Sequence, residues 1–528
     1  MSLKQLHRER YYDRLWRLTP NEESLSSYYG GRSVSGDMSA RVMATPSVEN
    51  IVSGSVQSEK TSLISVDGGE SATEEADYGV SPFHTSINIV KCAVGAGSFG
   101  VPQAFMQEGL WGGLVGTFLL GAMAAYTITL LCHAEKYLVF KSPSKKHRYT
   151  YPEIARALFP RMVIGNVNCL EVLVYFSMCL SSIGVCGIYG IFILQTFPEV
   201  YSCNQFYIII FLAITMLLLA LLRSFKYIAF TSIMGDVAVT MGILAAIVDG
   251  FLNNTATFDL PAFKIRGVPQ ASSTLAFLFL VHAIVLPMAQ SMKGDLANPK
   301  KFEQVAWLSL SFVTTLNALF GMLCYMLFQD GVESPVTGNL QKSWMLQVVR
   351  ILLCVDLLFT VPMVLAFGRE ILERSFFKTS GFRMFSPEFL QKNDTMVRNI
   401  IRFILVGIVI GIAAGMNSSS GASNAFENLI SLVGGGCGVL LGFVIPPMLY
   451  LATLRDSKKL NFNNLSFHLG IIAIGLVLFF SSTYLTINGM IYPDSNTTLT
   501  TINTTTTAFT TFTPTTPSTT FINTTSFT

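Results

Sequence analysis

Eleven long apolar segments fill the middle of this chain, and they are the feature that most restricts its fold. Each has about 18 residues or more, the length that an α-helix needs to cross a bilayer. The segments are 85–108, 110–135, 163–197, 205–222, 227–252, 271–292, 303–328, 343–368, 399–416, 426–453 and 466–492. Backbone polar groups in lipid must be satisfied internally, which favours helices. The pattern predicts an all-α polytopic membrane protein with 11 transmembrane helices.

Composition agrees with a membrane location and excludes several function classes. The chain is 51% hydrophobic and 13% charged, whereas soluble domains carry about 25% charge. The net charge of +3 comes without a basic cluster, so we expect no nucleic-acid partner. The nine cysteines show no CxxC spacing, so we expect no metal site. We find no nucleophile with a paired base and no phosphate loop, so we expect neither an enzyme nor a cofactor.

The two ends of the chain differ from its middle. Residues 1–83 are polar and contain no signal-peptide core, so we interpret them as a disordered N-terminal tail. Residues 493–528 are rich in Thr and Ser with almost no charge, a composition typical of disordered, often O-glycosylated segments. The membrane domain is therefore expected to occupy residues 84–492.

Charge and glycosylation signals predict the orientation. With a cytosolic N-terminus, the short inner loops hold 21 Lys and Arg and the outer segments hold 3, as the positive-inside rule requires. An odd number of spans then places the C-terminal tail in the lumen or outside the cell. The sequons predicted to lie on that face start at Asn253, Asn496, Asn503 and Asn523. Two further sequons, at Asn393 and Asn464, fall in predicted inner loops and are interpreted as chance matches.

The first apolar segment is interrupted by a glycine run. The interrupting residues are Gly95, Ala96, Gly97, Ser98 and Gly100, and Pro102 follows within one turn. Glycine and proline disfavour a continuous helix, and backbone groups freed in lipid cost several kcal/mol each. A break at mid-depth is tolerated where it lines a cavity, and the half-helix that follows can bind a carboxylate at its N-terminus. Alternatively, the small residues only let another helix pack closely.

The sixth segment, 271–292, carries a second set of helix-weakening residues. His282 lies near mid-depth, and Pro287 frees a backbone carbonyl near Ala283. A buried imidazole in lipid is costly, so it should face protein or water. Segments one and six correspond if segments 1–5 and 6–10 form an inverted repeat, with one extra helix. Two weakened helices in corresponding positions predict a substrate site at the bilayer midplane.

Three stretches of sequence resemble one transporter family. The stretches are INIVKCAVGAGSFGVPQAFMQEG (87–109), HAIVLPMAQSMKGDLANPKKF (282–302) and FTVPMVLAFGREILER (359–374). They resemble the amino acid/auxin permease superfamily, closest in look to its proton-coupled and its vacuolar or vesicular amino acid transporters, over about residues 80–492. The resemblance implies a fold similar to that of the bacterial leucine transporter. It also implies secondary active transport of amino acids by alternating access.

Two positions depart from that family. Proton-coupled members carry a histidine where this chain has Asn88 and a glutamate where it has Leu280. The usual proton-coupling residues are therefore missing, although substrate binding by the backbone is unaffected. The coupling ion remains H⁺ or Na⁺, because the third stretch also resembles the sodium-coupled neutral amino acid branch.

Other ionisable residues within the segments are candidates for ion coupling. They are His282, Asp236 and Asp356, because ionisable groups inside the membrane commonly mark ion pathways. Each also has a structural interpretation. His282 can make an interhelical hydrogen bond that fixes packing, and either aspartate can form an ion pair with Lys91 or Arg350.

The expected substrate contacts follow from the chemistry of an amino acid. Backbone N–H groups of residues 97–100 offer donors to the carboxylate, and carbonyls near residues 94–95 and 279–280 accept from the ammonium. The Ser98 hydroxyl can also reach the carboxylate, or instead bond its own helix backbone. The predicted contacts are Val94, Gly95, Ala96, Gly97, Ser98, Phe99, Gly100, Phe279, Leu280 and His282, of which the two phenylalanines flank the breaks.

Two further signals concern location and regulation. Cys203 and Cys324 lie toward the outer face, where the family resemblance implies a disulfide and two free thiols are the alternative. Glu59, Leu63 and Ile64 resemble an acidic dileucine signal, read by sorting adaptors, that directs proteins to lysosomes and vacuoles; such short motifs also occur by chance. The membrane is therefore the plasma membrane or that of an acidic organelle. The long tail would equally suit an amino acid sensor.

Overall fold

The computed structural model describes residues 80–141, 148–164, 167–201, 204–221, 228–292, 299–378, 394–419 and 422–492. Nearly all of the predicted N-terminal tail and the whole C-terminal tail lie outside these ranges, so both remain expectations. The described residues are helical except for short turns and one two-stranded hairpin. The predicted all-helical class is confirmed for this part of the chain.

The helices follow the predicted apolar segments closely. In chain order they are α3 (Pro82–Ala93), η3 (Ala96–Gly100), α4 (Val101–Glu108), α5 (Leu110–Lys141), α6 (Tyr151–Leu158), α7 (Cys169–Val200), α8 (Gln205–Leu221), α9 (Ile228–Asn253), η4 (Ile265–Gly267), α10 (Val268–Leu278), α11 (His282–Ser291), α12 (Pro299–Phe328), η5 (Gln329–Gly331), η6 (Val336–Asn339), α13 (Trp344–Lys378), α15 (Asp394–Ser419), α16 (Ala422–Leu432), η7 (Val433–Gly438), η8 (Leu440–Val444), α17 (Ile445–Asp456) and α18 (Phe462–Ile491). The strands β1 (Val163–Ile164) and β2 (Val167–Asn168) form the hairpin.

Eight helical stretches in the described residues are long and apolar enough to cross a membrane. Two more apolar stretches are shorter: the whole of α8 (Gln205–Leu221) and the part of α9 from Val237 to Asn253. The first predicted span does not reach this length because it is divided between α3, η3 and α4. The protein is therefore a polytopic membrane protein, and length and composition alone do not fix the predicted count of 11 spans.

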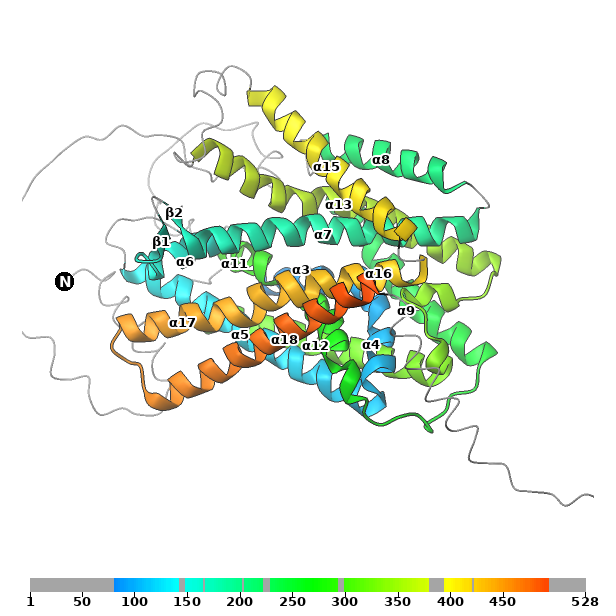
Figure 1. Ribbon diagram of the computed structural model, residues 1–528, viewed down its shortest axis with the longest axis horizontal. Helices are drawn as coiled ribbons and strands as arrows, with labels where there is room; N and C mark the ends of the chain where they lie inside the picture. Colours follow the sequence, from blue (N-terminus) through cyan, green and yellow to red (C-terminus); the bar gives the residue numbers. More distant parts are fainter. Residues whose placement is uncertain are drawn as a thin grey trace, which may run out of the picture.

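The long helices run roughly side by side (Figure 1). Helix α7 lies in the middle of the view, with α8, α13 and α15 above it and α5, α17 and α18 below it. Helices α13 and α15 pack directly on α7, and α12 and α17 pack on α5. The molecule thus has two helix groups that meet along α7 and the interrupted helices.

Each helix group has its own hydrophobic core. One core joins α3, α4, α5, α10, α11, α12 and α17. The other joins α7, α8, α9, α13, α15 and α16. The interrupted helices contribute to both, since Ala93 belongs to the first core and Ala96 to the second, and Phe279 belongs to the first and Phe277 to the second. Both interruptions therefore lie at the boundary between the two cores.

Three local elements were missing from the sequence prediction, the first being the β1–β2 hairpin at the start of the predicted span 163–197. Helix α6 lies in a predicted inner loop, where Pro152 follows Thr150 and the Glu153 side chain accepts from the Thr150 N–H at 3.1 Å. This Thr-x-x-Glu pattern is a helix-start signal readable from sequence. The Tyr151 hydroxyl then donates to the carbonyl of Leu441 at 2.7 Å and fixes α6 to η8.

Another element that the sequence did not predict is a π-helical stretch in the tenth predicted span. The helix there is continuous, but part of it is wound more loosely than an α-helix. Residues Val433–Gly438 and Leu440–Val444 are π-helical, a conformation that frequently occurs at functional sites. Gly434 lies directly against the backbone carbonyl of Ser273 in α10, where a Cβ atom would overlap that oxygen. The glycine run therefore allows η7 and α10 to pack backbone to backbone.

Candidate functional site

The first helix is interrupted where the glycine run predicts. Helix α3 begins with Pro82 after the Ser81 cap, whose hydroxyl accepts from the His84 N–H at 3.3 Å. It ends at Ala93, and Val94 adopts an extended conformation. The chain then forms the short helix η3, whose five residues are all buried, and resumes as α4. Residues 95–100 thus interrupt the α-helix, and 96–100 do so in the protein interior.

Ser98 lies at the centre of this interruption. Its side chain is 0% exposed, and its Oγ has no hydrogen-bond partner among the described residues. Its backbone N–H donates to the Gly95 carbonyl at 3.0 Å. The alternative of a hydroxyl bonded to its own helix is therefore not observed. A buried polar group without a partner costs about 1–3 kcal/mol, so this hydroxyl is available to a polar ligand.

The sixth predicted span is also interrupted, but not where Pro287 suggested. Residues 279–281 are non-helical, and α11 begins at His282 and runs through both Ala283 and Pro287. The carbonyl expected to be freed near Ala283 lies inside α11, whereas the carbonyls expected near residues 279–280 fall in the non-helical segment before His282. The chain leaves the helix by short turns, since the Leu280 N–H donates to the Phe277 carbonyl at 3.1 Å. Pro287 removes a single helical hydrogen bond, which α11 tolerates.

The two interruptions are in contact. Helix α10 packs against η3, and Gly97 faces the Phe277 ring so closely that a Cβ atom would lie 3.0 Å from it. The first break therefore lies against the end of α10, directly before the second break, so predicted segments one and six are neighbours. The inverted-repeat argument thus led to two segments that the fold brings together.

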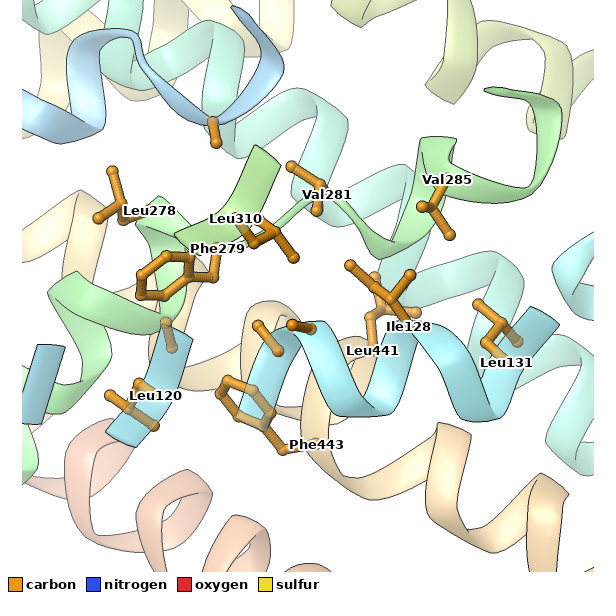
Figure 2. Close-up of a cluster of buried hydrophobic side chains, with 14 of the residues drawn as sticks. Leu120, Ile128, Leu131, Leu278, Phe279, Val281, Val285, Leu310, Leu441 and Phe443 are labelled. Carbon is orange, nitrogen blue, oxygen red and sulfur yellow. The ribbon is translucent and has the colours of Figure 1, made fainter. Parts of the chain in front are cut away.

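The two phenylalanines beside the breaks point in different directions. Phe99 packs against Phe192 and Phe320, with ring centroids 6.0 and 6.3 Å away. Figure 2 shows Phe279 in another cluster, near Leu278 and Leu310, with side chains of α5 and η8 close by. The structure does not bring them together around a common space. The hypothesis that both flank the substrate requires rearrangement of one of them.

His282 begins α11 immediately after the break. The residue is 1% exposed, and its Nε2 lies 2.9 Å from the Thr127 hydroxyl of α5. Its Nδ1 makes no hydrogen bond within the described residues, although the Ala124 and Phe279 carbonyls are near the ring. The interhelical hydrogen bond expected from the packing interpretation is made by Nε2, while Nδ1 remains available beside the break.

The two aspartate candidates lie on neighbouring helices, α9 and α13, which pack together. The Asp356 carboxylate lies directly against Gly235, the residue before Asp236 in α9. The Asp236 side chain lies outside the described part of the structure. Arg350 donates to the carbonyls of Thr337 and Leu340 at 2.9 and 2.7 Å, so it supports the η6 turn.

Sequence reasoning missed two buried acids near the interrupted helices. Glu427 of α16 accepts from the side-chain amides of Gln103 and Gln107 in α4 and of Gln270 in α10. Glu108 is 2% exposed and accepts from Ser272 at 3.4 Å. Both acids fall at the ends of predicted spans, where a charge is ordinarily interpreted as a boundary residue. Their amide and hydroxyl partners come from distant segments, so no local signal could have paired them.

Comparison with known proteins decides the family. Residues 79–488 match the family described as "Transmembrane amino acid transporter protein". The chain belongs to the transmembrane amino acid transporter family. This family match confirms the resemblance drawn from the sequence motifs, and it implies a small-molecule amino acid as substrate.

Individual relatives of this amino acid transporter are distant. "Amino acid transporter ANT1" of Arabidopsis thaliana is 26% identical over 423 residues, covering 78% of this chain and 93% of the relative. "Proton-coupled amino acid transporter-like protein pathetic" of Drosophila melanogaster is 22% identical over 392 residues, covering 71% and 77%. Among solved structures, a mutant of the Eremococcus coleocola manganese transporter has 15% identity and a TM-score of 0.48, covering 81% of this chain and 91% of that chain.

An apolar cavity of about 370 Å³ lies away from the two breaks of this transporter family member. It is formed between α7, α15, α16 and η7, and its lining residues are Leu180, Ile183, Gly184, Gly411, Ile412, Gly415, Met416, Leu429, Leu432, Val433 and Cys437. It offers no charged partner for the carboxylate or ammonium of an amino acid. No group of three or more His, Cys, Asp or Glu that could hold a metal is found within the described ranges.

Several predicted sites fall wholly or partly outside the described residues. Cys324 is buried in α12, but Cys203 lies outside, so their pairing stays a prediction. Asn253 is exposed at the end of α9, where its amide donates to the Asp249 carbonyl at 2.9 Å. The three sequons of the C-terminal tail and the sorting signal lie outside the described residues, namely Asn496, Asn503, Asn523, Glu59, Leu63 and Ile64.

Proposed function

We propose that this protein is a secondary active transporter that moves amino acids across a membrane by alternating access. The observation that carries the proposal is the meeting of two interrupted helices around a buried, unpartnered Ser98 hydroxyl. Interrupted helices that meet in the interior offer backbone donors and acceptors where a regular helix offers none. An amino acid needs both, because it carries a carboxylate and an ammonium group.

The substrate carboxylate is held at η3 and the start of α4. There the Ser98 hydroxyl and N–H groups of residues 97–100 act as donors, of which the Ser98 N–H must first leave the Gly95 carbonyl, and the positive end of the α4 dipole adds attraction. The ammonium group is held by carbonyls near residues 94–95 and 279–280. His282 lies next to the second break, where its Nδ1 can bond a substrate group. Because all of η3 is buried, the substrate enters by movement of the half-helices.

The proposed architecture is two inverted repeats of five spans and one extra helix. The first repeat begins with the pair α3 and α4, and the second with the pair α10 and α11. Helix α8, which has 17 residues, and helix α9, which has 26, complete the count of 11 spans. Inner loops rich in Lys and Arg support a cytosolic N-terminus and an extracellular or lumenal C-terminus. The membrane would be the plasma membrane or that of a lysosome or vacuole, the latter if residues 59–64 act as a sorting signal.

Coupling to protons is proposed over coupling to sodium. The relative from Drosophila melanogaster carries proton coupling in its name, and His282 is an ionisable group buried beside the substrate region. Asp356, packed against α9, is the second candidate for carrying the coupled ion. Neither residue stands at the positions where proton-coupled members carry histidine and glutamate, which are Asn88 and Leu280 here.

The test is uptake of a labelled amino acid mixture into proteoliposomes, under a pH gradient and separately under a sodium gradient. Stimulation by the pH gradient alone is the expected result. Stimulation by sodium alone would assign the protein to the sodium-coupled branch. Absence of flux under either gradient, despite substrate-induced thermal stabilisation, would contradict transport and favour an amino acid sensor.

A further inference from the structure

A carboxylate on α16 is surrounded by glutamine side chains from the two interrupted helices. Glu427 is 9% exposed. Its Oε2 accepts from Gln103 Nε2 at 3.3 Å, and its Oε1 accepts from Gln270 Nε2 at 3.1 Å and from Gln107 Nε2. Helix α4 follows the first break and α10 precedes the second. One side chain therefore connects three helices that border the proposed substrate region.

The hydrogen bonds to Glu427 come from neutral amides. An ionised carboxylate that is buried in the protein loses its hydration, and neutral amides offset this cost less than a cation would. Binding of a positive charge at Glu427 removes the uncompensated negative charge. The partners therefore suit a carboxylate that alternates between an ionised and a neutral form.

The same cluster lacks hydrogen-bond donors. Gln103 Oε1 and Gln107 Oε1 are both buried, and neither has a partner within the described residues. A proton on Glu427 turns one of its oxygens into an O–H donor, which can bond one of these amide oxygens. The missing donor and the uncompensated charge point to the same ligand, a proton.

Other ionisable groups on the elements that contact α16 lie elsewhere. Helix α10 has none, and the acid of α4, Glu108, accepts from Ser272 instead. Glu171 of α7, Arg398 and Arg402 of α15 and His468 of α18 are near the opposite ends of their helices, while Tyr484 of α18 is exposed. The remaining titratable groups with described side chains on these elements are not among the hydrogen-bond partners of Glu427, namely Cys169, Tyr175, Cys179, Cys186 and Tyr189 of α7 and Cys437 of η7. The side chains of Glu199 of α7 and Asp394 of α15 lie outside the described part of the structure.

We propose that Glu427 binds the coupling proton, and that its protonation state controls how firmly α16 holds α4 and α10. The ionised carboxylate accepts three amide N–H groups in charge-assisted bonds, which are stronger than neutral ones. Protonation removes the charge and weakens this hold, so the two half-helices beside the substrate can move. The proton enters from one side of the membrane and leaves to the other; no other bond changes. This inference rests on the proposed transport function.

Contacts between α16 and the first helix break connect substrate binding at η3 with protonation of Glu427. Gly100, the last residue of η3, packs against Ile430 and Phe426 of α16. A Cβ atom at Gly100 would lie 3.3 Å from the Ile430 side chain and 3.9 Å from the Phe426 ring. These residues flank Glu427 on the same helix. A substrate carboxylate bound at η3 would therefore act on a segment that contacts the helix carrying Glu427. Figure 1 shows α4 and α16 together near one end of the bundle.

The test is the variant Glu427→Gln in proteoliposomes, with two transport assays. Glutamine has nearly the same shape and cannot ionise, so it mimics the protonated side chain. We expect stimulation of uptake by a pH gradient to fall at least tenfold, while exchange of labelled for unlabelled amino acids without a gradient stays within about threefold. The exposed Glu333→Gln is the matched control and should leave both assays unchanged. Gradient-driven uptake by Glu427→Gln equal to that of the unmodified protein would overturn the proposal.

A second measurement separates failure of this inference from failure of the proposed function. Infrared difference spectra between acidic and alkaline pH should contain a protonated-carboxyl band that Glu427→Gln lacks. Loss of this band in a protein that shows no flux would contradict transport but retain the proton site. An unchanged band together with normal flux would reject the site alone. If Glu427→Gln does not fold, Glu427→Asp should fold and shift the pH midpoint of uptake, and an unshifted midpoint would reject the proposal.

Discussion

The imidazole Nε2 of His282 lies 2.9 Å from the hydroxyl of Thr127, and this bond joins α11 to α5 next to the second helix break. Thr127 also lies 3.0 Å from the Met123 carbonyl of its own helix, to which its hydroxyl can donate. The contact fixes the first residue of α11 to an uninterrupted helix. The half-helix after the break therefore has a fixed starting point in the core.

The variant Thr127→Val tests this fixed point. Valine keeps the shape of threonine but leaves His282 with two buried ring nitrogens and no hydroxyl partner. The expected cost is about 1–3 kcal/mol, seen as a lower thermal unfolding midpoint in detergent. Thr315→Val is the control, because that hydroxyl is exposed and bonds only its own helix, at the Ser311 carbonyl. Equal midpoints for both variants would argue against a structural role for the His282 contact.

Ser98→Ala should affect transport and stability in opposite ways. The Ser98 hydroxyl has no partner in the described structure, so its removal should leave the unfolding midpoint unchanged or slightly raised. If the hydroxyl donates to the substrate carboxylate, KM should rise about tenfold, since a hydrogen bond to a charged group contributes about 1.5–3 kcal/mol. Initial uptake rates against substrate concentration measure this. A lower midpoint with an unchanged KM would instead assign Ser98 to packing.

Gly434 and Gly436 offer a matched pair on η7. A Cβ atom at Gly434 would overlap the Ser273 carbonyl of α10, whereas one at Gly436 meets nothing within 4 Å. Gly434→Ala should therefore push η7 from α10 and cost about 1–3 kcal/mol through overpacking. Gly436→Ala should be nearly neutral. Thermal unfolding of both purified variants provides the comparison, and equal stability would show that η7 and α10 need no such close approach.

Glycan attachment tests the predicted orientation. Replacing Asn253, Asn496, Asn503 and Asn523 together by Gln should lower the glycan mass seen on gels of the protein expressed in eukaryotic cells. Replacing Asn393 and Asn464 by Gln should change nothing, because both are predicted to face the cytosol. A mass loss in the second variant and none in the first would reverse the assigned orientation.

The amino-acid sequence by itself determined the class of fold, the approximate helix boundaries and the first helix break. These features depend on local properties: a run of apolar residues long enough for a bilayer, and glycines that do not sustain a helix. The family was also readable from contiguous motifs around residues 87–109 and 282–302. The second break was expected in the correct segment, with free carbonyls near residues 279–280, but its cause was assigned to Pro287, because a proline is the strongest local signal there.

The tertiary structure alone decided which side chains meet. The amides of Gln103, Gln107 and Gln270 reach Glu427 from helices up to 324 positions away in the chain, and no spacing rule predicts such contacts. The structure also directs Phe99 and Phe279 into different cores, although both flank helix breaks. The reason is physical: periodicity and composition fix what one helix can bury, but the partner of a buried polar group depends on how distant helices pack.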